Sequence, residues 1–148
     1  MTGVPPLEIR PYREADRAAL VALWESCDLV RPWNDPAADI ALCLATPHAH
    51  IFVGLEPDRA GALSAGLMCG SDGHRGWLYY LAVAPGRRRS GLARAMVRHA
   101  EEQLAERGVR KVQLMIRAEN EAVREVYEHL GYQVEPRVVM SRWLDRSA

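Results

Sequence analysis

The spacing of hydrophobic residues changes several times along the chain, and each change marks a new element. Alternating or uniformly apolar segments predict strands, and apolar residues three or four positions apart predict helices. The predicted strands cover residues 7–12, 50–56, 62–70, 77–83, 109–117 and a last segment around 138–143. The predicted helices cover residues 13–28, a segment that begins after Asn34 or Asp35 and ends near Pro47, residues 90–107, and residues 120–130.

The order of these elements predicts an α+β fold built on one mixed sheet. Residues 50–83 contain three strands joined by short turns, one of them with an Asp-Gly step, which is typical of an antiparallel meander. The strand–helix–strand run that follows requires a right-handed crossover between two parallel strands. We therefore expect a mixed, mostly antiparallel twisted sheet with one parallel β-α-β crossover and helices on both faces.

The chain has 148 residues, which is enough for one domain with its own core. We expect that domain to span residues 7–145, with short flexible termini at 1–6 and 146–148. Three widely spaced cysteines, an N-terminal segment without an apolar run and the lack of a membrane-length apolar stretch favour a cytoplasmic protein. The formal net charge is zero and no Cys/His cluster has zinc-like spacing, so we expect no nucleic acid, membrane or metal.

The segment PGRRRSGLARAM, residues 85–96, places three arginines and a glycine where a helix begins. A helix N-terminus presents free N–H groups and a positive dipole end, so this turn suits a phosphate group as well as solvent. A nucleoside triphosphate turn requires Lys and Ser or Thr where this chain has Leu92 and Ala93. A dinucleotide turn requires more glycines in register and a preceding strand–helix–strand unit. Coenzyme A, with its diphosphate, is the best match of the three.

Two motifs in the second half of the chain carry a family resemblance. Arg88-x-x-Gly91-x-Ala93, after LAVAP, resembles the acetyl-CoA signature of the GCN5-related N-acetyltransferase (GNAT) family. Further on, NEAVREVYEHLGY resembles a later segment of the same family, with Val126 in place of leucine and Tyr132 in place of phenylalanine. Over about residues 8–143 the chain is similar to this family, and LWESCDLVRPWNDP, DGHRG and YYLAVAP resemble its bacterial YpeA-like subgroup.

This resemblance implies the GNAT fold and an acyl-CoA-dependent N-acetyltransferase that works by direct transfer in a ternary complex, without a metal. The pyrophosphate of acetyl-CoA would lie on the turn after the fourth strand, and the pantetheine arm along that strand. The N–H of Val83 would contact the thioester oxygen and hold the oxyanion, although composition alone favours a buried core strand for residues 81–83. The implied cofactor-binding residues are Leu81, Ala82, Val83, Arg88, Arg89, Ser90, Gly91, Leu92, Ala93, Asn120 and Tyr127.

Two residues of the later segment have both a structural and a chemical interpretation. Asn120 is suited to cap a helix, and the family uses this position for a hydrogen bond to pantetheine. Tyr127 shares an apolar helix face with Val123 and Leu130, and a tyrosine at this position in the family protonates the leaving thiolate. Because a tyrosine has a pKa of about 10 and a thiol one of about 8.5, that transfer is slightly uphill and requires the sulfur in contact.

The acceptor amine must be neutral to attack, and many relatives use a glutamate on the fourth strand to take its proton. Residues 77–83 contain no carboxylate and no histidine. At pH 7 an α-amine is roughly 14% neutral and a lysine only about 0.04%. The missing carboxylate therefore favours a weakly basic amine of a small molecule or of a peptide or protein N-terminus.

Residues that orient the acceptor or take its proton must then lie elsewhere. In the family fold the first two helices line the acceptor cleft, and Arg31 with Trp33 would suit an acidic or planar acceptor. Tyr79 and Tyr80 point to opposite faces of a regular strand, so at most one of them faces the cleft. The candidates are Glu25, Arg31, Trp33, Asn34, Asp72, His74 and Tyr79, of which Asp72 and His74 also suit a plain turn.

The sequence therefore predicts acetyl transfer from acetyl-CoA to the amine of a small molecule or peptide. The alternative is an acetyl-CoA-binding sensor or interaction module without turnover, which the missing strand carboxylate keeps open. Because family members often pair through the C-terminal part of the sheet, a homodimer is a further expectation.

Overall fold

The computed structural model describes residues 7–60, 62–88 and 90–146 of the chain. The chain divides into two compact units, Met1–Met115 and Ile116–Ala148. The first unit contains the sheet and the helices that pack on it, and the second contains helix α4 (Glu121–His129).

Within the first unit, five strands pair in the order in which they occur in the chain. They are β1 (Glu8–Pro11), β2 (Ala49–Glu56), β3 (Ala62–Ser71), β4 (Gly76–Val83) and β5 (Val112–Leu114). Strands β1 to β4 are antiparallel to one another in succession, and β5 runs parallel to β4. The predicted antiparallel meander with one parallel crossover is therefore confirmed.

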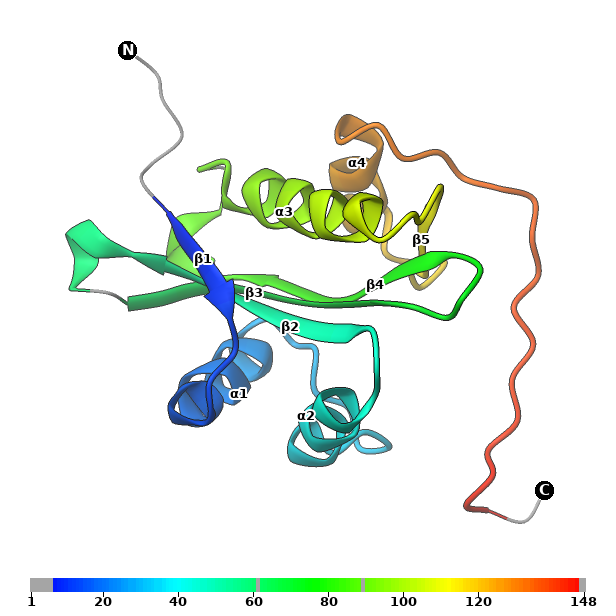
Figure 1. The fold of residues 1–148 in the computed structure, drawn as a ribbon, viewed down its shortest axis with the longest axis horizontal. Coiled ribbons are helices and arrows are strands. Elements are labelled where there is room, and N and C mark those ends of the chain that lie inside the picture. Colours follow the sequence, from blue (N-terminus) through cyan, green and yellow to red (C-terminus); the bar gives the residue numbers. More distant parts are fainter. Residues whose placement is uncertain (1–6, 61, 89, 147–148) are drawn as a thin grey trace. The chain divides into compact units, whose positions relative to one another are not determined.

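Helices cover both faces of this sheet (Figure 1). On one face α1 (Arg17–Ser26) packs on β3 and β4, and α2 (Pro36–Ala45) packs on β2. On the other face the crossover helix α3 (Leu92–Glu106) packs on β2, β3 and β4. The row of apolar residues predicted for this helix is buried at Leu92, Met96, Ala100 and Leu104. The predicted two-sided α+β architecture is confirmed.

Capping side chains determine where helices α2 and α4 begin. Of the two predicted caps of α2, Asp35 carries out the role, because its carboxylate accepts from the N–H of Ala37 at 3.0 Å. Asn120 caps α4 by accepting from the N–H of Val123 at 3.3 Å. None of the helices in the described ranges has the length and apolar character needed to cross a membrane.

Two predicted strands differ in the structure. The segment at 109–117 forms a strand only over the three residues of β5. The strand predicted around 138–143 is absent, and that prediction was wrong: the segment pairs with no strand among the described residues, and Val138 and Met140 are 87% and 90% exposed. Alternation predicts which side chains would share a face, but a strand also requires a backbone partner.

Candidate functional site

Strand β4 extends beyond its parallel neighbour. The β4–β5 ladder ends at the pair Leu78–Leu114, whereas β4 continues to Val83. On the far side of β4, the N–H of Ala84 donates to the carbonyl oxygen of Ser64 at 2.8 Å. Because such bonds alternate along an antiparallel ladder, the N–H and C=O of Val83 point away from β3. The end of β4 therefore presents an edge toward the β5 side that no described strand covers.

The C-terminal end of helix α1 lies against this open edge. The thiol of Cys27 donates to the carbonyl oxygen of Val83, with 3.3 Å between sulfur and oxygen. Cys27 and Val83 are both half-buried, whereas Ala82 is buried. Of the β4 residues predicted to hold pantetheine, Ala82 thus has a packed side chain, and Val83 has a backbone edge that a ligand can reach.

A β-bulge at Tyr80 changes which side chains of β4 face α1 and α2. Between the pairs Gly66–Ala82 and Met68–Tyr79, β4 has one residue more than β3, and Tyr80 has a φ of 55°. The bulge turns the Tyr80 ring onto Trp24 of α1, with ring centroids 4.0 Å apart and planes 13° from parallel. Tyr79 and Tyr80 line the same cavity. The prediction that at most one of them faces the cleft was wrong, because it assumed a regular strand.

The turn before α3 provides an uncapped helix N-terminus. Gly91 has a φ of 85°, a left-handed conformation that glycine adopts without steric cost, and no side chain caps the helix. The first intrahelical bond runs from the N–H of Ala95 to the oxygen of Gly91, so the N–H groups of Leu92 and Ala93 have no acceptor within the helix. Ser90 bonds through its hydroxyl to the oxygen of Arg87.

The three arginines of this turn have different environments. Arg87 forms a bidentate ion pair with the fully buried carboxylate of Glu56, with 2.9 Å from Nε to Oε1. This pairing lowers the pKa of Glu56. The turn was predicted to suit a phosphate group or solvent, but Arg87 instead pairs inside the protein. Arg88, at the motif position, is exposed and pairs with no described residue. Arg89, also predicted to bind the cofactor, lies outside the described residues.

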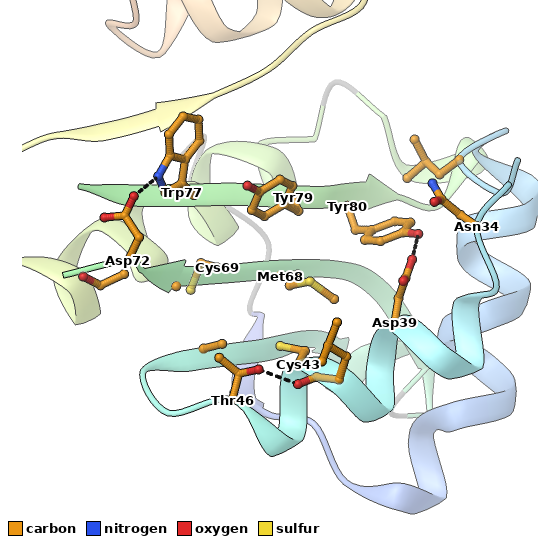
Figure 2. A pocket seen from close by; sticks show the side chains of 15 residues that line it. Asn34, Asp39, Cys43, Thr46, Met68, Cys69, Asp72, Trp77, Tyr79 and Tyr80 are labelled. Atoms are coloured by element: carbon orange, nitrogen blue, oxygen red, sulfur yellow. Dashed lines mark hydrogen bonds between the residues drawn. The ribbon is translucent and has the colours of Figure 1, made fainter. Parts of the chain in front are cut away.

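A cavity of about 650 Å³ lies on the face of the sheet that carries α1 and α2 (Figure 2). Its walls come from the α1–α2 loop, from α2, from β3 and the turn after it, and from β4. Three of the predicted acceptor residues, Asn34, Asp72 and Tyr79, line it. They come from three different parts of the chain: the α1–α2 loop, the turn after β3, and β4.

The carboxylate missing from β4 is supplied to this cavity by helix α2. The hydroxyl of Tyr80 donates to Oδ2 of Asp39 at 2.6 Å, and Figure 2 shows this bond between the Tyr80 side chain of β4 and the Asp39 side chain of α2. Burial, together with this bond, raises the pKa of Tyr80. The hydroxyl therefore stays protonated and remains the donor.

Asp72 lies in the turn at the other end of β4 and has several donors of its own. Its Oδ1 accepts from the N–H groups of His74 and Arg75, and its Oδ2 accepts from the indole N–H of Trp77 at 3.0 Å. These donors lower the pKa of Asp72 to about 2. Asp72 is therefore a fixed negative charge and a poor proton acceptor at neutral pH.

Four predicted acceptor residues do not line the cavity. Glu25 and His74 are exposed, and Trp33 is 44% exposed. Arg31 lies 3.6 Å from the carboxylate of Asp28 in its own loop. The loop that was expected to hold an acidic or planar acceptor therefore contributes Leu29 and Asn34 to the cavity, and not its cation or its indole.

Sequence reasoning missed Asp39 and Tyr80. A usable signal existed for Asp39, which stands four residues before Cys43 and so shares its helix face. Cys43 is buried and also lines the cavity. No comparable signal existed for Tyr80, because nothing in YYLAV marks the position of the bulge.

The second unit carries the two remaining predicted residues. Asn120 is the cap of α4, as described above. Tyr127 is 7% exposed, and its ring makes an edge-to-face contact with Tyr132, with centroids 5.5 Å apart. Burial raises the pKa of Tyr127, so its hydroxyl is protonated across the physiological pH range. In the described ranges, no cluster of His, Cys, Asp and Glu has an arrangement suited to a metal.

Comparison with known proteins adds independent findings. Residues 15–132 match the model of the acetyltransferase (GNAT) family. An acetyltransferase of Sodalis glossinidius is 42% identical over 134 residues, which are 90% of this chain and 92% of that protein. Among solved structures, AAC(6′)-Iy in complex with the bisubstrate analogue CoA-S-monomethyl-acetylneamine has a TM-score of 0.78 at 18% identity, covering 93% and 98% of the two chains. The aminoglycoside antibiotic 6′-N-acetyltransferase of Acinetobacter haemolyticus has a TM-score of 0.73 at 21% identity, covering 93% and 99%.

Proposed function

The chain belongs to the GNAT family of acetyltransferases, and from that premise we propose that it transfers the acetyl group of acetyl-CoA to the amine of a small molecule. The observation that carries this proposal is the edge of β4 that no described strand covers, with the N–H of Val83 directed away from β3. An extended pantetheine arm pairs with such an edge as an added strand would. The CoA-containing analogue bound to a structural neighbour supports the same cofactor.

The turn that follows β4 has the properties of a diphosphate site. Its donors are the N–H groups of Leu92 and Ala93, and its side-chain cation is Arg88. Both suit the negative charge of a phosphate, through direct hydrogen bonds and through the helix dipole. We assign Arg88 to the pyrophosphate of acetyl-CoA, and Arg87 to holding the turn in place.

The chemical step follows from these assignments. The neutral amine attacks the thioester carbonyl carbon, a C–N bond forms, and the N–H of Val83 stabilises the negative charge that develops on the oxygen. When the C–S bond breaks, its electron pair stays on sulfur, which takes a proton. We assign this proton to the hydroxyl of Tyr127, because a tyrosine at this position has that role in the family. The proton lost from nitrogen passes to solvent, and Tyr127 regains its proton from water. Asn120 caps α4 and, in this proposal, also forms a hydrogen bond with pantetheine.

The size of the cavity and the bound analogue of the neighbour favour a small-molecule acceptor over a protein N-terminus. We further propose that the protein acts in the cytoplasm, that it needs no metal and that it forms a homodimer. The cytoplasmic location is inferred from the unpaired, widely spaced cysteines, and the lack of a metal from the direct transfer mechanism of the family. The homodimer is inferred because family members often form dimers.

The alternative is a protein that binds acetyl-CoA without turning it over. A thiol-release assay over a broad panel of amines, combined with calorimetry of acetyl-CoA, ATP and NAD, separates the two. We expect binding of acetyl-CoA alone, and release of free CoA with at least one amine. Tight binding of acetyl-CoA without release for any amine would favour the binding module, and binding of ATP in its place would refute the proposal.

A further inference from the structure

The cavity between α2 and the sheet has a charge that selects among amines. Two carboxylates, Asp39 and Asp72, contribute to its lining, and no Lys, Arg or His of the described chain does. The nearest loop cation in sequence, Arg31, instead lies beside Asp28. A ligand in this cavity therefore meets negative charge without a compensating cation.

Asp39 has unused capacity to bind a donor. Its Oδ2 accepts the hydroxyl of Tyr80, and no other described side chain donates to the carboxylate. Because an ionised carboxylate has about four acceptor sites, one bond from Tyr80 leaves most of them available. Tyr80 is held in turn by its stack on Trp24, so the carboxylate has a fixed partner and a fixed position.

Aromatic rings form the wall between the two carboxylates. Trp77 and Tyr79 lie in β4 with ring planes 22° apart, and Figure 2 shows them in the row that leads from Asp72 to Tyr80. Met68 of β3 and Leu42 of α2 add apolar surface. Aromatic faces next to carboxylates suit a cationic nitrogen on an apolar carbon skeleton.

We propose that this cavity binds the acceptor as a cationic amine with an apolar or aromatic body and without a carboxylate. Asp39, positioned by Tyr80, binds its ammonium group, which passes a proton to solvent before the neutral amine attacks. This inference rests on the proposed function and names the class of its substrate. An amino acid is disfavoured, because its carboxylate would enter a site that already carries two negative charges and has no cation for it. The structure thus argues against the acidic acceptor expected from Arg31, and it assigns contact with a planar body to Trp77 and Tyr79 and not to Trp33.

The test compares amines that differ only in a carboxylate. Tyramine is compared with tyrosine, and cadaverine with lysine, by calorimetry and by thiol release with acetyl-CoA. We expect the decarboxylated member of at least one pair to bind at least about tenfold more tightly and to give the larger kcat/KM. Equal affinities, or preference for the carboxylated members, would overturn the inference and leave acetyl transfer intact. Selective binding without thiol release would support the cavity assignment and refute the proposed activity.

Two variants and a control locate the effect. Asp39→Asn should raise the KM and Kd of the preferred amine about ten- to hundredfold and reduce its discrimination from the carboxylated partner, because an amide cannot supply the charge. Tyr80→Phe should have a smaller effect of the same kind. Glu102→Gln, on the exposed side of α3, should change neither constant. Acetyl-CoA affinity should stay unchanged in all three variants.

The Asp39→Asn variant also gives the result that would contradict the assigned role. That result is a lower kcat with unchanged affinity for the amine and unchanged selectivity between amines.

Discussion

Arg87 and Glu56 join the phosphate-site turn to the sheet. Glu56 is the last residue of β2 and is fully buried, and the guanidinium of Arg87 meets its carboxylate through two N–H groups. The residues are 31 positions apart in the chain. The first arginine of the RRR run is therefore committed to the protein's own structure, and the second remains available for a ligand.

Removing Arg87 should destabilise the protein more than removing a neighbouring arginine. Arg87→Ala leaves the Glu56 carboxylate buried without a cation, and we expect the melting temperature to fall by roughly 5 °C or more. Arg94→Ala is the matched control, because Arg94 is exposed on α3 and has no partner among the described residues. Equal melting temperatures for the two variants would show that the ion pair does not anchor the turn.

The same pair predicts a pH dependence of stability. Arg87 lowers the pKa of Glu56 in the folded state, so the unfolded chain binds more protons as the pH falls toward about 4.3, the usual pKa of glutamate. The contribution of the pair is present above that pH and is lost as the pH falls through the folded pKa. The difference in unfolding free energy between wild type and Glu56→Gln should therefore shrink from pH 7 to pH 3. A difference that stays constant over this range would contradict the assignment.

Charge reversal at Arg88 should weaken the binding of acetyl-CoA. Arg88→Glu puts a carboxylate beside the diphosphate, and we expect the Kd from calorimetry to rise by at least about tenfold. Arg94→Glu makes the same change of charge on the first turns of α3 outside the motif, and it should have a much smaller effect. If both variants lose the same affinity, the effect comes from the general field of the helix and not from Arg88.

Cys27 offers a chemical probe of the β4 edge. Cys43 and Cys69 are buried, and burial raises the pKa of both thiols, that of Cys69 to about 12. Cys27 is half-buried and contacts Val83. N-ethylmaleimide should therefore modify the native protein once, at Cys27, and saturating acetyl-CoA should slow that reaction. Mass spectrometry of digested protein checks both points, and an unchanged rate with acetyl-CoA would place the cofactor elsewhere.

Tyr127→Phe should affect turnover more than binding. The hydroxyl is protonated at neutral pH, because burial raises its pKa, and the variant loses only the proton donor. We expect kcat to fall at least about tenfold with little change in the Kd of acetyl-CoA. Tyr132→Phe is the control, because it removes a hydroxyl from the ring that contacts Tyr127 and keeps the proposed acid. Wild-type turnover in Tyr127→Phe would remove its role as the acid.

The fold was largely predictable because its signals are local. The four-residue spacing from Leu92 to Leu104, the cap at Asn120 and the Asp-Gly turn before β4 each determine a local conformation without help from distant residues. The segment at 138–143 shows the limit of such signals. Its alternation is strand-like, but strand formation depends on a partner that the segment itself does not specify.

The candidate site was predictable where it depends on a motif and unpredictable where it depends on packing. Gly91 could be assigned to the turn from its place in the motif, and the structure gives it a left-handed φ that glycine adopts without steric cost. The Asp39–Tyr80 bond spans 41 positions and requires both the bulge in β4 and the placement of α2. The ion pair of Arg87 likewise depends on where β2 ends, which the RRR run alone does not indicate.

Direct transfer of the acetyl group to an amine is tested most directly by following a labelled acetyl group. The protein is incubated with acetyl-CoA carrying an isotopically labelled acetyl group and with tyramine, cadaverine and the rest of the amine panel, and mass spectrometry then examines both amine and protein. The account predicts the label in an amide of the amine, with free CoA released in equal amount and no stable label on the protein. Unlabelled amines throughout, with intact acetyl-CoA, would contradict it.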